Sequence, residues 1–237
     1  MSDYAVNSKE PIAAWIPSRD TTGDGTTTLT DLVGTNSGTL VNMDPSTSWV
    51  TSDSKRALFF QRTGKTQVTI NTALTFSGST FSISWWQYFD SFASLYPFVL
   101  SAVNMVEWGS NNGTSMFYAP GTSFIGASQF VLSVWEHRVI TVSAGSIRLY
   151  VNGSLVDTKT HTYSATISNL VLGNGQQSGN DIFSMYGKLD DIRLFTSSPV
   201  LDSSDVAYLY DSGAGRGRMA VSGESRRRRQ SVSGGVL

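Results

Sequence analysis

Pairs of carboxylates that flank a sugar carry out glycoside hydrolysis, and the acids of this chain do not fall into that arrangement. The four glutamates stand at positions 10, 107, 136 and 224, and none belongs to a Glu-x-Asp-x-x-Glu strand. Glu107, next to Trp108, is the best placed of them, but no second acid lies near it in the sequence. Because the reaction needs two carboxyl groups, we expect a protein that is not an enzyme.

Nucleophilic catalysis and zinc binding have equally little support in the sequence. The chain has two histidines, His137 and His161, and no cysteine, and it contains no Gly-x-Ser-x-Gly turn that could present a serine nucleophile. Two histidines without a cysteine make a zinc site improbable. We therefore expect His137 to be a packed, hydrogen-bonded side chain rather than a general base.

An acidic loop near the N-terminus has the spacing of a calcium site. Asp20, Asp24, Gly25 and Asp31 occupy positions 1, 5, 6 and 12 of an EF-hand-type loop, although position 12 carries aspartate instead of the usual glutamate. The helices that flank such a loop are missing. One interpretation is a structural calcium ion held by the three aspartates. The other, which we favour, is that these acids cap backbone amides in a turn.

Aromatic side chains could recognise a carbohydrate ligand, because flat rings can pack against the apolar face of a sugar. Neighbouring residues of a strand point to opposite faces, so the pair Trp85-Trp86 must direct one ring away from the core. We expect Trp85 to be inside and Trp86 outside. The candidate ligand-binding residues are Trp86, Tyr88 and Trp108. Other rings that could line the same sheet are Trp49, Tyr96 and Tyr118. The alternative is that most of these rings belong to the core.

Short alternating segments separated by polar turns predict the strands that would position these residues. The clearest is a hairpin in which Trp135–Val142 and Ile147–Val151 flank a Gly145-Ser146 turn, and the second run closes on Asn152-Gly153. The other expected strands cover 12–16, 38–41, 57–60, 67–70, 81–89, 96–100, 103–108, 115–118, 129–132 and 169–173. A short helix is expected over 202–210, capped by Asp202. So many short strands predict an all-β fold, a two-sheet antiparallel jelly-roll sandwich.

Composition divides the chain into three expected segments: an N-terminal arm over 1–11, the sandwich over 12–212 and a flexible basic tail over 213–237. The tail contains six arginines and one glutamate, and four of the arginines are consecutive, Arg226, Arg227, Arg228 and Arg229. Such a segment cannot form a core. Its four adjacent arginines could bind nucleic acid or an acidic protein partner, or serve as a protease site, and the alternative is a solvated, disordered end. The sequence shows neither the pattern of a signal peptide nor an apolar run of 18 residues, so we expect no membrane insertion.

Three motifs resemble a known family. They are Trp-Glu-His from position 135, Leu-Tyr-Val-Asn-Gly from 149 and Gly-Lys-Leu-Asp-Asp-Ile-Arg-Leu-Phe from 187. In this order they resemble the laminin-G-like branch of the concanavalin A-like lectin/glucanase family, over roughly residues 12 to 212. The resemblance implies the jelly-roll fold. It also implies that one structural calcium could be bound, with Asp191 among the contributing positions, although Asp191 could equally pair with Arg193.

The fold of that family hosts lectins, glycosidases, adhesion modules and virion proteins alike. We expect a non-enzymatic structural or adhesion protein of a phage virion, either a capsid decoration or a fibre-associated subunit. The segment Ala-Trp-Ile-Pro-Ser-Arg-Asp at 14–20 is similar to phage-encoded members. Neighbouring coat proteins or further copies of the chain would be its partners, and nucleic acid would bind only through the basic tail. The alternative is a calcium-assisted carbohydrate-binding module of a bacterial surface or secreted protein, which would bind a surface glycan.

Overall fold

The structure is a computed structural model that describes residues 3–92, 97–103, 107–111, 113–119, 122–143, 145–160, 162, 164–175, 183–211 and 215. Within these residues the chain forms two antiparallel sheets and two short helices, so the predicted jelly-roll sandwich is confirmed. Arg226, Arg227, Arg228 and Arg229 of the predicted tail lie outside the described residues, as do Tyr96 and His161.

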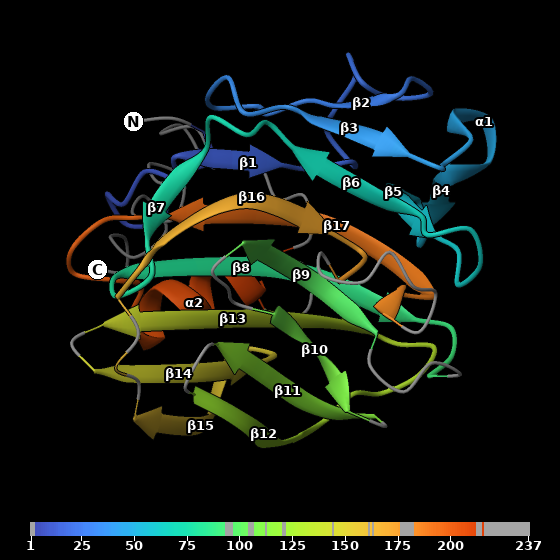
Figure 1. Cartoon of the computed structure of the whole chain (residues 1–237). Coiled ribbons are helices and arrows are strands. Elements are labelled where there is room, and N and C mark those ends of the chain that lie inside the picture. The colour runs from blue at the N-terminus through green and yellow to red at the C-terminus, as the bar shows by residue number, and fades with distance from the viewer. Residues whose placement is uncertain are drawn as a thin grey trace, which may run out of the picture.

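The two sheets lie face to face (Figure 1). The strands of the first sheet are β1 (Ala13–Trp15), β4 (Trp49–Ser52), β5 (Lys55–Phe60), β8 (Phe81–Phe89), β13 (Trp135–Ser143), β14 (Ser146–Val151), β15 (Ser154–Thr160) and β17 (Gly187–Phe195). Their order is β15-β14-β13-β8-β17-β5-β4, and β1 pairs with β17. Strands β8 and β17 lie in the middle of this sheet, and both are buried along most of their length, although β17 carries four charged residues, Lys188, Asp190, Asp191 and Arg193.

The second sheet has the order β12-β11-β10-β9-β16-β6-β3-β2, and β7 pairs with β16. Its strands are β2 (Thr28–Leu29), β3 (Gly38–Val41), β6 (Gln67–Ile70), β7 (Thr75–Ser77), β9 (Phe98–Val103), β10 (Glu107–Asn111), β11 (Thr114–Ala119), β12 (Thr122–Gln129) and β16 (Thr166–Leu172). The helix α1 (Pro45–Ser48) precedes β4, and α2 (Ser203–Tyr210) is the last helix or strand among the described residues.

Two strand predictions were wrong. The expected strand over 103–108 is divided, because β9 ends at Val103 and β10 begins at Glu107. Of the expected strand over 129–132, only Gln129 belongs to a strand, as the last residue of β12. Residues 130–132 form a loop in which Leu132 makes an isolated bridge with Phe89, and the side chains of Val131 and Leu132 are exposed. Its backbone is held by other segments, since Ser133 N donates to the carbonyl of Phe89 at 2.8 Å. Apolar composition alone therefore suggested a strand where tertiary contacts fix a loop.

The alternation of β8 places one set of side chains between the sheets and the other set on the outer face. Phe81, Ile83, Trp85 and Phe89 enter the core, as predicted for the first three, and Trp85 packs edge-on against Trp108 of β10 at 6.0 Å between ring centroids. The opposite face of β8 points away from the second sheet. It is this outer face of the first sheet that carries the features discussed below.

Helix α2 covers part of that outer face. Asp202 caps it and forms a capping box with Asp205, as the predicted N-cap requires. Val206 and Leu209 pack against outer-face residues of the first sheet.

Residues 4–9 of the predicted arm also lie on this outer face, because Val6 is buried in the same cluster and Lys9 pairs with the buried Asp205. The N-terminal segment is therefore part of the packed domain. None of the helices in the described part of the chain has the length and apolar character needed to cross a membrane.

Candidate functional site

Four neighbouring strands of the first sheet bring one row of side chains together on its outer face. Trp135 of β13 pairs with Tyr88 of β8, Tyr88 with Lys188 of β17, and Lys188 with Phe59 of β5. Residues that face each other across antiparallel strands lie on the same side of a sheet, with their side chains in reach of one another. We refer to Trp135, Tyr88, Lys188 and Phe59 as the aromatic row. All four are partly exposed.

The side chains of the aromatic row contact one another directly. The rings of Trp135 and Tyr88 are 5.7 Å apart between centroids, with their planes at 59°. The Lys188 ammonium lies 3.9 Å from the centroid of the Tyr88 ring and 5.8 Å from that of Phe59. Phe59 in turn packs against Tyr186 in a T-shaped arrangement, with 5.7 Å between the two ring centroids. Tyr88 is thus a support for both Trp135 and Lys188.

An ion pair lies beside these rings. Lys188 Nζ donates to both carboxylate oxygens of Asp90 at 3.1 Å, and the two side chains are 17% and 28% exposed. Asp90 directly follows β8, and its backbone N–H donates to the carbonyl of Tyr186 at 3.0 Å. The row therefore combines flat apolar surfaces with a charged donor and a charged acceptor that water can reach.

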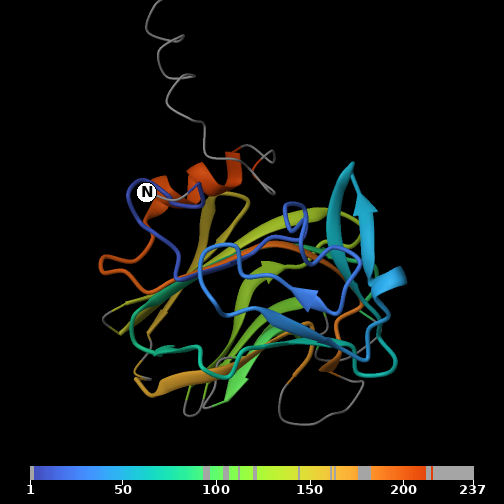
Figure 2. The same cartoon turned by 90° about the horizontal axis from the view of Figure 1, so that it is seen from above.

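The indole of Trp135 is oriented by a hydrogen bond from a distant hairpin. Its Nε1 donates to the hydroxyl of Ser52 at 3.1 Å, across 83 positions of sequence. Ser52 ends β4, at the tip of the β4–β5 hairpin. Figure 2 shows that this hairpin (cyan) and α2 (red) both rise on the outer side of the first sheet, at opposite ends of the molecule. A Trp ring held by both its indole nitrogen and a neighbouring ring keeps one orientation.

Trp86 is not available as a ligand-binding residue, which corrects the prediction. It points to the outer face, as expected, but it is only 3% exposed. The ring of Tyr210 from α2 stacks on the Trp86 ring, with 5.9 Å between their centroids, and the ring of His137 packs against it, with 5.1 Å between centroids. The helix thus covers a ring that local sequence alternation would leave in water.

The predictions for Trp108 and Trp49 are also wrong. Both were expected to line a ligand-binding surface, but both rings are buried in the core between the sheets. The outcome is different for Tyr88, which lies in the aromatic row. Of Tyr118 the structure describes only the strand position, on β11. Trp135 was missed as a candidate. Its signal was present in the alternation of β13, which puts Trp135 and His137 on the face opposite to Glu136 and Arg138.

The aspartates of the predicted calcium loop bind hydrogen-bond donors of the protein. Asp20 accepts from the backbone N–H groups of Gly23 and Thr30, each at 2.6 Å. Asp31 accepts from the N–H of Ala14 at 2.9 Å and from two further backbone groups. Asp24 pairs with an arginine, Arg56. Capping of backbone amides, the interpretation we favoured, accounts for Asp20 and Asp31.

Asp191 is also held by a cation. Its Oδ1 accepts from Arg193 Nε at 2.6 Å and its Oδ2 from Arg193 Nη2 at 2.9 Å, a bidentate pair. Across the described ranges, no three His, Cys, Asp or Glu side chains converge in a way that could hold a metal. Carboxylate oxygens that face N–H donors do not fit a calcium ion, which requires six or more oxygen ligands turned toward it.

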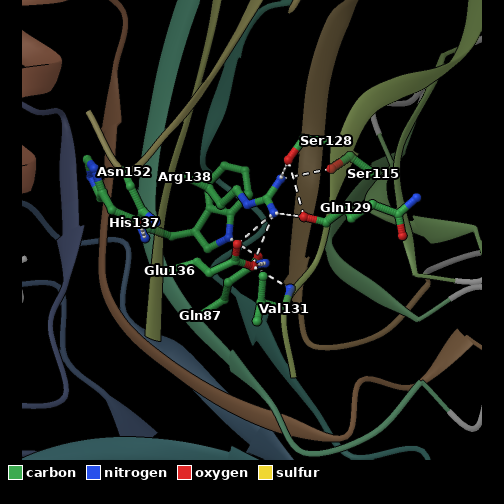
Figure 3. Close-up of polar contacts among 10 residues, drawn as sticks. Gln87, Ser115, Ser128, Gln129, Val131, Glu136, His137, Arg138 and Asn152 are labelled. Carbon is green, nitrogen blue, oxygen red and sulfur yellow. Dashed lines mark hydrogen bonds and ion pairs between the residues drawn. The ribbon is translucent and has the colours of Figure 1, made fainter. Parts of the chain in front are cut away.

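Glu136 and Arg138 form a buried ion pair between the sheets (Figure 3). Arg138 Nη2 donates to both carboxylate oxygens of Glu136, at 3.2 and 3.1 Å, and Nη1 donates to Ser115 of β11 at 2.8 Å. Glu136 also accepts from the N–H of Val131 at 3.2 Å. Burial lowers the pKa of Arg138, and the Glu136 carboxylate opposes that shift. The pair therefore links β13 to the second sheet through Arg138 and to the loop that begins at Phe130 through Glu136.

His137 is a packed side chain, as predicted. It is buried, its Nε2 is 2.9 Å from the hydroxyl of Ser84, and it lies under the rings of Trp86 and Tyr210. Desolvation lowers its pKa to about 3, with a smaller contribution from the charge of Arg193. The imidazole is therefore neutral in the folded protein at physiological pH.

The model of one protein family, described as the concanavalin A-like lectin/glucanases superfamily, matches residues 61–207. No curated protein matches the sequence. Solved structures do match the fold. Domain 4 of AbnA, an extracellular arabinanase from Geobacillus stearothermophilus, was determined in complex with arabinotriose; it is 14% identical, with a TM-score of 0.67 over 85% of this chain and 98% of that domain.

Two further similar structures belong to larger chains. The binding domain of Paraclostridial Mosquitocidal Protein 1 is 17% identical, with a TM-score of 0.62 over 86% of this chain and 52% of that one. Trypanosoma rangeli sialidase, in complex with 2,3-difluorosialic acid, is 14% identical, with a TM-score of 0.61 over 88% of this chain and 34% of that one. This chain thus spans about half of the first of these chains and a third of the second. At these identities the likeness concerns the fold.

Proposed function

This chain belongs to the concanavalin A-like lectin/glucanases superfamily, and from that premise we propose that it is a non-catalytic attachment protein that binds carbohydrate through the aromatic row. Members of the fold differ in what they do, so the proposal is built from the site and not from the family. The similar arabinanase domain, which holds arabinotriose, is an analogy for this use of the fold.

One observation carries the proposal: a partly exposed Trp135, fixed in orientation, lies in the same row as the Lys188–Asp90 pair. A flat ring can cover the apolar C–H face of a sugar, and the ion pair can bind its hydroxyls as donor and acceptor. Binding sites of small molecules typically combine apolar and aromatic surface with a few fixed polar groups. The aromatic row has this composition.

The contacts of the acids support a binding role without hydrolysis. Hydrolysis of a glycosidic bond needs two carboxyl groups on either side of the bond. The carboxylate at the row, Asp90, has both oxygens on Lys188, and Glu136 is turned inward to Arg138. Neither arrangement presents a carboxyl pair to a ligand on the outer face.

A glycan array followed by calorimetry tests the proposal. We expect the folded protein to bind a subset of glycans, and Trp135→Ala to weaken that binding by on the order of tenfold or more, as expected for removal of a central aromatic contact. Val134→Ala is the matched control, because Val134 is the exposed neighbour of Trp135 in the sequence and lies outside the row. An array on which the folded protein binds nothing would refute the proposed function.

The setting in which attachment would occur remains a prediction from the sequence. We propose that it is a phage virion, where the chain would decorate the capsid or accompany a fibre, associate with coat proteins or with its own copies, and use Arg226–Arg229 to bind an acidic partner. The alternative setting is a bacterial surface or the extracellular space. Mass spectrometry of purified particles separates the two: high copy number in particles supports the virion, and recovery only from envelopes or supernatant contradicts it.

A further inference from the structure

The positive charge at the aromatic row is already matched by its neighbours. Lys188 Nζ contacts both oxygens of Asp90 at 3.1 Å and lies 3.9 Å from the centroid of the Tyr88 ring. A carboxylate and the face of an aromatic ring both stabilise a cation. An acidic ligand would have to approach Asp90 as well as Lys188, and like charges at an interface disfavour binding. The row therefore lacks the unmatched positive charge that selects an anion.

The same pair can still bind a neutral ligand. Its two side chains are partly exposed, so their outer edges are open to hydrogen bonding. An ammonium only donates and a carboxylate only accepts, whereas a hydroxyl does both. Two hydroxyls of a sugar could therefore bind Lys188 and Asp90 together without separating them. A neutral sugar with neighbouring hydroxyls matches the pair, and a sugar acid does not.

The row is longer than one sugar ring. Trp135 and Phe59 lie on β13 and β5, and two strands, β8 and β17, separate them. Three strand spacings correspond to about 14 Å, perpendicular to the strands. Rings stand at both ends, since Phe59 packs with Tyr186 and Trp135 with Tyr88, and the ion pair lies between them. This order suits a chain of sugars that crosses the strands.

We infer that the ligand of the aromatic row is an uncharged oligosaccharide lying across β13, β8, β17 and β5. Trp135 stacks on one sugar ring, Phe59 on another, and Lys188 and Asp90 bind hydroxyls between the two. The inference rests on the proposed carbohydrate-binding function and specifies the chemical class of its ligand.

The test uses a glycan array in which each neutral mono-, di- and trisaccharide is paired with the same chain carrying a sialic or uronic acid. We expect the neutral member to bind on the order of tenfold more tightly, because the acid meets Asp90. Asp90→Asn leaves the Lys188 charge unmatched and should reduce or reverse this preference. Asp157→Asn is the matched control, since Asp157 pairs with Lys159 on β15, away from the row.

Chain length is tested with the same probes. Trp135→Ala should weaken binding of every glycan that binds, whereas Phe59→Ala should weaken trisaccharides and leave monosaccharides unchanged. Equal or tighter binding of the acidic members by the unmodified protein would overturn the inference, and so would an unchanged preference in Asp90→Asn. Monosaccharides that bind as tightly as trisaccharides would overturn the extended ligand. In all three cases glycan binding itself would stand, whereas an array without any binding refutes the proposed function instead.

Discussion

The ring of Tyr210 on α2 stacks on the ring of Trp86 on β8, with 5.9 Å between their centroids and 21° between their planes. The turn between β14 and β15 also packs closely against Tyr210, since a Cβ on Gly153 would come within 2.9 Å of the Tyr210 ring. Gly153 also adopts a φ of +82°, which favours glycine. The C-terminal helix is thus seated on the sheet by aromatic stacking. This contact helps to bury a Trp that points away from the core between the sheets.

Replacement of the two outer-face tryptophans should separate stability from binding. Trp86→Ala removes a buried ring under α2, so we expect the free energy of unfolding to fall by about 3–5 kcal/mol. Trp135→Ala removes a partly exposed ring and should cost clearly less stability while it abolishes most glycan binding. Denaturant titration of both variants measures the difference. Equal loss of stability in the two would show that Trp135 is a structural residue.

The buried pair of Glu136 and Arg138 should be sensitive to the loss of one partner. Either Glu136→Gln or Arg138→Met leaves its partner without its counter-charge inside the sandwich, and we expect each to reduce the free energy of unfolding by about 3–5 kcal/mol. The double variant should lose less than the sum of the two single variants, because no unmatched charge remains. A double-mutant cycle by denaturant titration measures this coupling. Additive losses would show that the two residues contribute independently.

Protonation of His137 should weaken the fold at acidic pH. Its pKa is about 3 in the folded protein and lies near 6.5 in an unfolded chain, so the unfolded state binds more protons between these values. Stability from this residue is complete above pH 6.5 and decreases as the pH falls toward 3. Between pH 6.5 and 5 the expected loss is about 2 kcal/mol.

Denaturant titration at several pH values of the wild type and of His137→Gln measures this effect. Glutamine can still hydrogen-bond Ser84 but does not titrate, so the variant should lose less stability than the wild type over the same pH range. Both proteins share every other ionisable group, so the difference between their slopes of unfolding free energy against pH isolates the contribution of His137. Identical slopes would contradict a neutral, buried His137.

Calcium should leave the thermal stability unchanged. A ligand that binds only the folded state raises the melting temperature, and the effect grows with its concentration. The oxygens of Asp20 and Asp31 instead accept backbone N–H groups, and those of Asp191 bind Arg193. We therefore expect the same melting temperature in millimolar calcium and in excess chelator. A calcium-dependent rise would show that the acidic loop rearranges to bind the ion.

Much of the fold could be predicted because its signals are local. The alternation of β8 requires Trp85 and Trp86 to point in opposite directions, and both do. Asn152 and Gly153 take the positive φ values of a tight hairpin turn, as this dipeptide predicts. Asp202 and Asp205 form the helix cap that their spacing indicates. Each of these outcomes depends on residues within a few positions of one another.

The candidate site depends on contacts between distant segments. Trp86 and Trp135 are both outer-face tryptophans of adjacent strands, and their local patterns are alike. Only the position of α2, more than 100 residues after β8, buries the first. The β4–β5 hairpin, 83 residues before Trp135, binds the indole nitrogen of the second and leaves its ring partly exposed. The placement of α2 and of the β4–β5 hairpin, and not the local sequence, decided which of the two rings could meet a ligand.

By itself, then, the sequence determined most of the central strands and which face of each strand its residues occupy, since sterics and hydrophobic alternation act over neighbouring residues. The tertiary structure decided which outward rings are covered, which charges are paired, and that the acidic loop serves backbone amides. Burial and pairing depend on partners brought together by folding, and their identity is not encoded at any one position of the chain.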